Sequence, residues 1–186
     1  REHFEDTLAS KTAKPYVDTV SQTNTLGSIS VSVTRYQVQA DAKFYIPYEG
    51  SDANIKADFP KGFLPAYGSG LTFKGKAADG SLEFFAITDR GPNGDGPKVP
   101  ASVLTAGATG SLDAKFFPSP SFSPAIGIIS VGKDGAILKS SMPIRFDANN
   151  KATGLPLAAG KVGATQEVPL NDAGKYDPKG KATFSD

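Results

Sequence analysis

The sequence predicts an all-β fold, either a sandwich or a propeller. Three features of the 186 residues predict it: short runs of alternating apolar and polar residues, Asp-Gly turns between those runs, and weak helical periodicity almost throughout. Long loops rich in glycine and proline connect the runs (20 Gly and 14 Pro). The chain has no exact internal repeat, so repetition alone does not decide between the two architectures.

Composition narrows the classes of function. The chain carries 20 Lys and Arg against 19 Asp and Glu, for a formal charge of +1. This balance argues against a nucleic-acid partner and against a polybasic membrane anchor. No apolar run is long enough to predict a transmembrane segment. With no cysteine, and with His3 as the only histidine, acid–base chemistry would rely on carboxylates, tyrosine, lysine or metal-bound water.

The first residues predict an irregular lead-in. Residues 1–28 are expected to form an N-terminal arm, because the segment up to about Asn24 is polar and has no clear period. The chain begins at Arg1 and is rich in Gly, Pro, Ser and Thr, which fits an exported protein whose signal peptide has been removed. A shortened polypeptide would look the same.

Strands are expected from residue 29 onward. Ile29, Val31 and Val33 alternate with polar residues, which predicts a strand with one solvent-facing side. Residues 38–46 predict a second strand, ending before Pro47. Residues 49–70 are expected to form a loop, held in place by the packing of four apolar side chains: Phe59, Phe63, Leu64 and Tyr67.

Two hairpins are the clearest local prediction. Each consists of two strand-like runs around a turn with an Asp-Gly pair. The first has runs at 71–74 and 82–88, and the second has runs at 125–131 and 136–145. Segments 91–124 and 146–160 are expected to be a linker and a loop, and Val168 and Leu170 to precede a turn at 171–174.

The segment that follows the first hairpin concentrates side chains suited to a site. Asp89, Asn93 and Asp95 offer the hard oxygen ligands that Ca²⁺ and Mg²⁺ prefer, and Arg90 offers a planar fork for phosphate or carboxylate. A rigid strand end is a common place for such groups. The alternative is a stiff polar turn, since Asn-Gly and Asp-Gly pairs and two prolines also occur here.

The glycines of the same segment have a possible role in anion binding. Gly91, Gly94 and Gly96 permit backbone conformations in which N–H groups converge on an anion. The spacing matches neither an EF-hand, because no glutamate closes the loop, nor a P-loop, because no Gly-Lys-Ser/Thr follows.

An ordered series of motifs resembles the phytase-like family, also called "esterase-like activity of phytase". The series covers about residues 68 to 172, and Asp-Arg-Gly-Pro at 89–92 is its most specific part. The motifs of the series are the segments 68–73 (GSGLTF), 85–92 (FAITDRGP), 123–127 (SPAIG), 142–145 (MPIR) and 153–156 (TGLP). The resemblance implies a secreted or periplasmic β-propeller of four-stranded blades with metal-assisted action on phosphate or other esters. It also implies that Asp89 and Arg90 lie at the mouth of the channel.

The chain departs from this family in its extent. Family members continue with an Asp-Pro-Glu-Gly element and further blades, whereas this chain stops at Asp186. A propeller blade takes about 40–45 residues. Residues 29–186 are therefore expected to form only the N-terminal blades. A C-terminal fragment of the same polypeptide, produced by cleavage after Asp186, is expected to complete the ring.

Two functions follow as expectations. The first is a Ca²⁺-dependent hydrolase of phosphate or related esters, acting on a small-molecule ligand. Its catalytic residues would be Asp89 and Arg90, its substrate-binding residues Arg90, Gly91 and Gly94, and its metal ligands Asp89, Asn93 and Asp95. The second is a non-catalytic binding or structural module of the cell envelope, in which Asp89 caps the strand end and Arg90 forms a buried ion pair.

Four further residues have two interpretations each. Tyr45, Tyr48 and Tyr67 could line a pocket, although a partly buried structural role is the default. Glu167 could be a ligand at a strand end, although a solvated side chain is the default.

Overall fold

The computed structural model describes residues 17–18, 24–26, 29–31, 34–133, 135–157 and 167–170, with side chains from residue 34 onward. The described chain is all-β, as predicted, apart from three short helical segments. The strands are β1 (Val17–Asp18), β2 (Asn24–Leu26), β3 (Ile29–Val31), β4 (Arg35–Tyr36), β5 (Val38–Ala40), β6 (Gly70–Lys76), β7 (Leu82–Ile87), β8 (Gly94–Asp95), β9 (Val99–Pro100), β10 (Ser111–Leu112), β11 (Ala114–Phe116), β12 (Ala125–Gly132), β13 (Gly135–Pro143) and β14 (Val168–Leu170). The helical segments are η2 (Ala42–Phe44), α2 (Ala53–Asp58) and η3 (Ala101–Val103).

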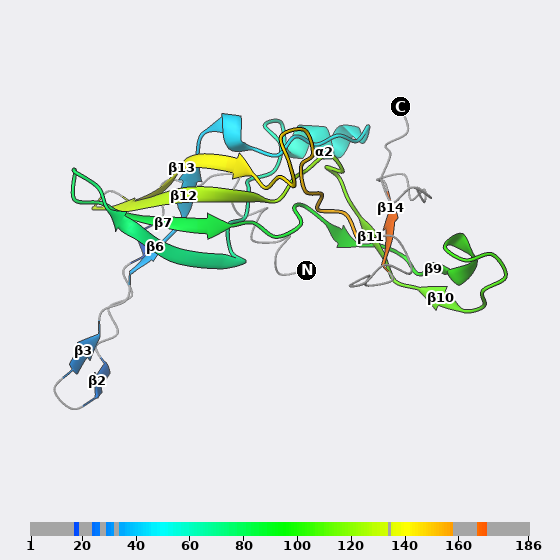
Figure 1. The fold of residues 1–186 in the computed structure, drawn as a ribbon, viewed down its shortest axis with the longest axis horizontal. Helices are drawn as coiled ribbons and strands as arrows, with labels where there is room; N and C mark the ends of the chain where they lie inside the picture. The colour runs from blue at the N-terminus through cyan, green and yellow to red at the C-terminus, as the bar shows by residue number, and fades with distance from the viewer. Residues whose placement is uncertain are drawn as a thin grey trace.

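The large sheet has five strands in the order β5-β13-β12-β7-β6. Both predicted hairpins are confirmed: β6 pairs with β7, and β12 pairs with β13. The two hairpins join through antiparallel pairing of β7 with β12, so that four neighbouring strands run alternately up and down (Figure 1). β5 adds a parallel strand beside β13.

One face of the large sheet carries a hydrophobic core. Directly paired residues point to the same side of a sheet, and on this side Ala86, Ile129, Ala136 and Leu138 are buried together. Tyr67 packs against this cluster from the segment between β5 and β6. The expectation that Tyr67 helps to hold that segment in place is therefore confirmed.

Both faces of the large sheet also expose apolar side chains. On the core side of the edge strand β6, Leu71 and Phe73 are 65% and 60% exposed. On the other side, Ile126 is paired with Met142, and Met142 is 64% exposed. A sheet with exposed apolar side chains on both faces has surface that suits contact with neighbouring elements.

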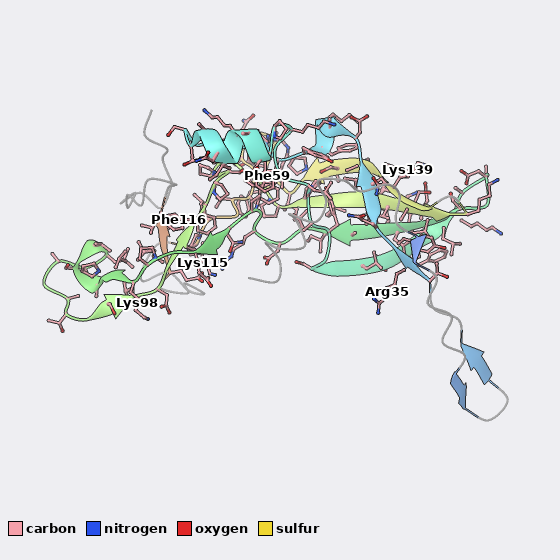
Figure 2. The ribbon with its side chains drawn as sticks, turned by 180° about the vertical axis from the view of Figure 1, so that it is seen from behind. Arg35, Phe59, Lys98, Lys115, Phe116 and Lys139 are labelled. Atoms are coloured by element: carbon pink, nitrogen blue, oxygen red, sulfur yellow. The ribbon has the colours of Figure 1, made fainter. Side chains whose placement is uncertain are left out.

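A second, smaller sheet lies beside the large one. It has the order β14-β11-β8, with β14 parallel to β11 and β8 antiparallel to it. Ala114, Val168 and Leu170 form its buried core, with exposures of 3%, 0% and 1%. Lys115 and Lys98 belong to this part of the molecule, and Lys139 belongs to the large sheet (Figure 2).

The prediction that residues 91–124 form a linker is wrong. This segment supplies β8 and β11 to the small sheet, and its strands β9 and β10 pair with each other. Its short strands are two or three residues long, which leaves too few positions for a readable alternation. The apolar residues of β11 pair with those of β14, which follows more than fifty positions later in the chain, so no local sequence pattern reveals this pairing.

Two other expected elements differ for local reasons. The strand expected over 38–46 ends at Ala40, since Asp41 accepts a bond from the Lys43 N–H (3.0 Å) and begins η2. The loop expected over 49–70 contains α2, because Asp52 caps a helix by accepting from the Asn54 and Ile55 N–H groups (2.8 and 3.0 Å).

The N-terminal region has strand pairing of its own. β1 pairs with β4, and β2 pairs with β3 in a separate two-stranded sheet. The side chains of the strand expected from residue 29 lie outside the described residues, as do most of residues 1–28 and the turn expected at 171–174. In the part of the chain that the structure describes, no helix has the length and apolarity needed to cross a membrane.

Candidate functional site

The candidate site begins where β7 ends. Thr88 is 5% exposed and is bonded to Ala125 twice: its N–H donates to the Ala125 carbonyl (3.0 Å), and its hydroxyl accepts from the Ala125 N–H (2.9 Å). These bonds fix the end of β7 to the start of β12. The chain leaves this fixed point at Asp89, which is exposed.

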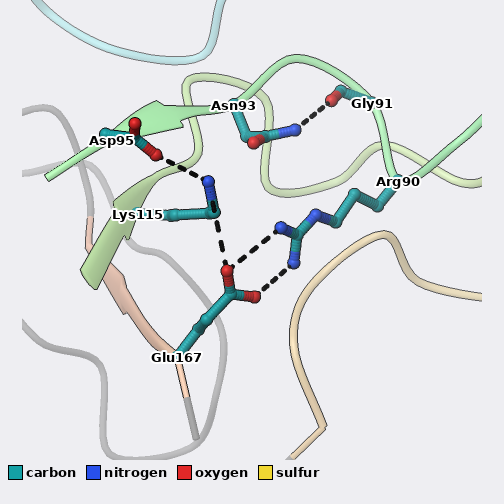
Figure 3. Close-up of polar contacts among 6 residues, drawn as sticks. All are labelled: Arg90, Gly91, Asn93, Asp95, Lys115 and Glu167. Carbon is teal, nitrogen blue, oxygen red and sulfur yellow. Dashed lines mark hydrogen bonds and ion pairs between the residues drawn. The ribbon is translucent and has the colours of Figure 1, made fainter. Parts of the chain in front are cut away.

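Arg90 forms a two-bond ion pair with Glu167. Its Nη1 donates to Glu167 Oε2 (2.6 Å) and its Nη2 to Oε1 (3.2 Å), which is the fork geometry favoured by guanidinium and carboxylate (Figure 3). The two side chains are 28% and 17% exposed. The guanidinium also lies 5.8 Å from the ring centroid of Phe117, which is 2% exposed. The bonds to Glu167 raise the pKa of Arg90 above its ordinary value.

Lys115 extends this pair into a network of four charges. Its Nζ lies 2.7 Å from Asp95 Oδ1 and 4.0 Å from Glu167 Oε1. The bond from Lys115 holds the pKa of Asp95 below its ordinary value. Two cations thus meet two carboxylates, and their formal charges cancel. The network joins the end of β7 to β8, to β11 and to the residue before β14 (Figure 3).

Two glycines allow the backbone around Arg90 to pack closely. Gly91 has φ +89°, and a Cβ built on it would lie 2.3 Å from the ring of Phe122. A Cβ on Gly154 would lie 2.0 Å from the carbonyl oxygen of Arg90. The segments 89–92, 122–127 and 153–156, which are separate in the sequence, therefore meet at this point.

The structure brings together some of the residues expected in the site. The Asn93 side-chain amide donates to the carbonyl of Gly91 (2.9 Å) and closes a tight loop, while Asp95 binds Lys115. Gly94 lies in β8 opposite Phe116. Asp89 makes no hydrogen bond or ion pair with any residue that the structure describes.

The three residues expected to bind Ca²⁺ do not share a site in the described structure. Asp95 is paired with Lys115, Asn93 bonds Gly91, and Asp89 is exposed. Within the described ranges, no group of three or more His, Cys, Asp or Glu side chains is placed to hold a metal ion. The N–H of Gly96, expected to face an anion, donates to the Ala114 carbonyl (2.8 Å).

Two members of the network carried little signal in the sequence. Glu167 is not the solvated side chain expected by default, because it is 17% exposed and is held by Arg90. Nothing in the sequence marks Lys115 as part of a site, since a lone lysine between Ala114 and Phe116 is an ordinary pattern for a half-exposed strand. Only the fold brings each charge to its partner.

No protein-family model, curated protein or solved structure matches this chain. The fold and the network themselves define an all-β protein in which two sheets are joined by ion pairs near the end of β7, an interior strand of the large sheet.

Proposed function

We propose that this chain is part of a phytase-like β-propeller that works outside the cytoplasm, as a binding or structural module of the cell envelope. The ordered motif series supports this proposal, as do the four antiparallel strands β6, β7, β12 and β13 within the five-stranded sheet. The exposed apolar side chains on both faces of that sheet would suit a blade packed between neighbours.

The observation that favours a non-catalytic role is the pairing of Arg90 with Glu167. Both terminal nitrogens of the guanidinium bind one carboxylate, and Lys115 is shared between Asp95 and Glu167. An oxyanion would have to displace Glu167 from a largely buried position before Arg90 could hold it. The loop that carries Arg90 and Asp95 therefore fits a structural role, in which its ion pairs hold the two sheets together.

A second candidate is a Ca²⁺-dependent hydrolase of phosphate or related esters, and the exposure of Asp89 favours it. This carboxylate lies next to Arg90 and makes no hydrogen bond or ion pair with any residue that the structure describes. A metal bound by Asp89, together with Asn93 and Asp95 after these release their present partners, would neutralise phosphate charge and activate water. Arg90, Gly91 and Gly94 would then contact the substrate.

Hydrolysis of a generic phosphomonoester and a phosphodiester, with and without Ca²⁺, separates the two candidates. The proposed module shows no turnover above the blank, and Arg90→Ala lowers its Tm, whereas Asp89→Asn leaves the Tm unchanged. Ca²⁺-dependent turnover that is lost in Asp89→Asn but kept in Asp113→Asn, another exposed aspartate, would overturn the non-catalytic proposal and establish the hydrolase.

We also propose that a C-terminal fragment of the same polypeptide completes the ring. The intact mass of the native sample, compared with the masses after denaturation, tests this. A second polypeptide released on denaturation is the expected result. A native mass equal to that of this chain alone contradicts the proposal.

A further inference from the structure

A cavity of about 190 Å³ opens near the end of the large sheet. Its walls come from the segment after β5, from the segment before β12, and from the neighbouring ends of β12 and β13. Four aromatic rings contribute to the lining: Phe44, Tyr45, Tyr67 and Phe122. Tyr45 and Tyr67 thus line a pocket, whereas the hydroxyl of Tyr48 accepts a bond from the Asp52 N–H (3.1 Å).

The polar groups of this cavity are hydroxyls and a single carboxylate. Ser121, Ser123 and Ser141 contribute hydroxyl groups beside those of the tyrosines. Glu49 is the one charged residue among the described lining residues, which include no lysine or arginine. Phosphate or another anion would therefore meet a carboxylate without a compensating cation, a repulsive arrangement. The lining favours a neutral ligand.

The walls are held in place by bonds within the protein. Tyr67 donates its hydroxyl to Ser141 Oγ (2.5 Å), and burial raises the pKa of Tyr67, so that it stays a neutral phenol. Glu49 accepts from the Ser121 N–H (3.1 Å) and from the Ser121 hydroxyl, and its own N–H donates to the Pro118 carbonyl (2.9 Å). A site that is already fixed loses less entropy when a ligand binds.

Tyr45 offers a further hydroxyl among the residues that line the cavity. It is half-buried, and its hydroxyl makes no hydrogen bond with any residue that the structure describes. A partly buried hydroxyl without a protein partner gains most from a ligand that can bond to it.

We propose that this cavity binds one neutral sugar ring. Its apolar C–H face would lie against the aromatic rings, and its hydroxyls would bond to Glu49 and Tyr45. The cavity volume is about that which six water molecules occupy in the liquid. It is below the range of pockets for drug-sized ligands, which fits a single ring. The inference does not depend on the role of the Arg90 network, since no charged member of that network lines the cavity.

Titration of the full chain with methyl glycosides of glucose, galactose, mannose and N-acetylglucosamine tests this proposal. Saturation-transfer difference NMR reports binding, and the shifts of the tyrosine ring signals give the affinity. At least one glycoside is expected to bind with a dissociation constant on the order of millimolar. Glucuronate and glucose 6-phosphate are expected to bind more weakly than methyl glucoside, because Glu49 repels them.

Glu49→Gln and Tyr45→Phe identify the site. Each is expected to weaken binding about tenfold, whereas the matched control Tyr36→Phe, on β4 and outside the cavity, leaves affinity unchanged. The proposal is overturned if none of the four glycosides binds, if glucose 6-phosphate binds more tightly than methyl glucoside, or if both cavity variants bind like the parent. Hydrolysis and Tm are measured separately, so these results do not decide the role of Arg90.

Discussion

Gly154 lies against the backbone of Arg90, so closely that a Cβ at position 154 would stand 2.0 Å from the Arg90 carbonyl oxygen. The Gly154 N–H also donates to the Phe122 carbonyl (3.3 Å). One glycine thus contacts two segments that precede it by more than thirty positions in the printed sequence. The first prediction follows from this contact.

Gly154→Ala is expected to destabilise the protein by about 1–3 kcal/mol, because the backbone at Arg90 cannot move away as a flexible side chain can. Urea unfolding followed by circular dichroism measures the loss. Gly68→Ala is the matched control, since a Cβ there meets nothing within 4 Å. Equal stability of the two variants would contradict the close contact.

The ion pair between Arg90 and Glu167 is expected to contribute to stability. Arg90→Met or Glu167→Gln should each lower the free energy of unfolding by about 1–3 kcal/mol, since each removes the two-bond partner of a largely buried charge. The double variant should lose less than the sum of the two single losses. Strictly additive losses in this double-mutant cycle would show that the two side chains do not interact.

The acid sensitivity of the large sheet is expected to depend on Glu83. Lys74 and Lys139 bond its two carboxylate oxygens (2.5 and 2.9 Å), and these bonds lower the pKa of Glu83. Because the pKa is lower in the folded state, the stabilisation is complete above the ordinary glutamate pKa of about 4.3 and disappears as the pH falls below it.

The Tm measured between about pH 6 and pH 3 tests this expectation. It should fall less steeply in Glu83→Gln than in the parent protein, because glutamine has no proton to gain. Lys139→Met should also reduce the slope, since it removes one of the two bonds. A parent-like slope in both variants would place the acid sensitivity elsewhere in the chain.

The exposed apolar side chains of β6 are expected to contribute little to the stability of this chain. The double variant Leu71→Ser/Phe73→Ser should lose no more than about 1 kcal/mol, because both side chains already face solvent. Leu138→Ala, at a position that is 5% exposed, should cost about 2–5 kcal/mol. Urea unfolding compares them, and comparable losses would mean that β6 is covered in solution.

An element of this fold could be predicted from the sequence when the strands that pair lie close together along the chain. The two hairpins were predictable, because strand alternation and the turn residues lie within one short window. α2 was missed, because a helix of six residues begun by a single cap at Asp52 shows no apolar period. β14 was recognisable as apolar, but not its parallel pairing with β11.

The candidate site divides in the same way. The composition of their own loop marks Arg90 and Asp95 as site candidates, and the structure places both in one network. Their partners could not be predicted, since Arg90 and Glu167 are separated by 77 positions, and Asp95 and Lys115 by 20. A loop rich in charged and glycine residues is typical of a site or of a polar turn, and only the fold shows that its charged side chains pair with other parts of the chain.

The pairing of β7 with β12 has a consequence for folding speed. Thr88 and Ala125 are neighbours in space but 37 positions apart in the chain. Each hairpin can close locally, whereas their union requires a long loop to close, at an entropic cost that nearby pairing avoids. We expect this closure to set the refolding rate, with β7 left as an open edge until then. Stopped-flow refolding of a variant shortened between β9 and β10 would measure the refolding rate, which should rise because a shorter loop costs less entropy to close.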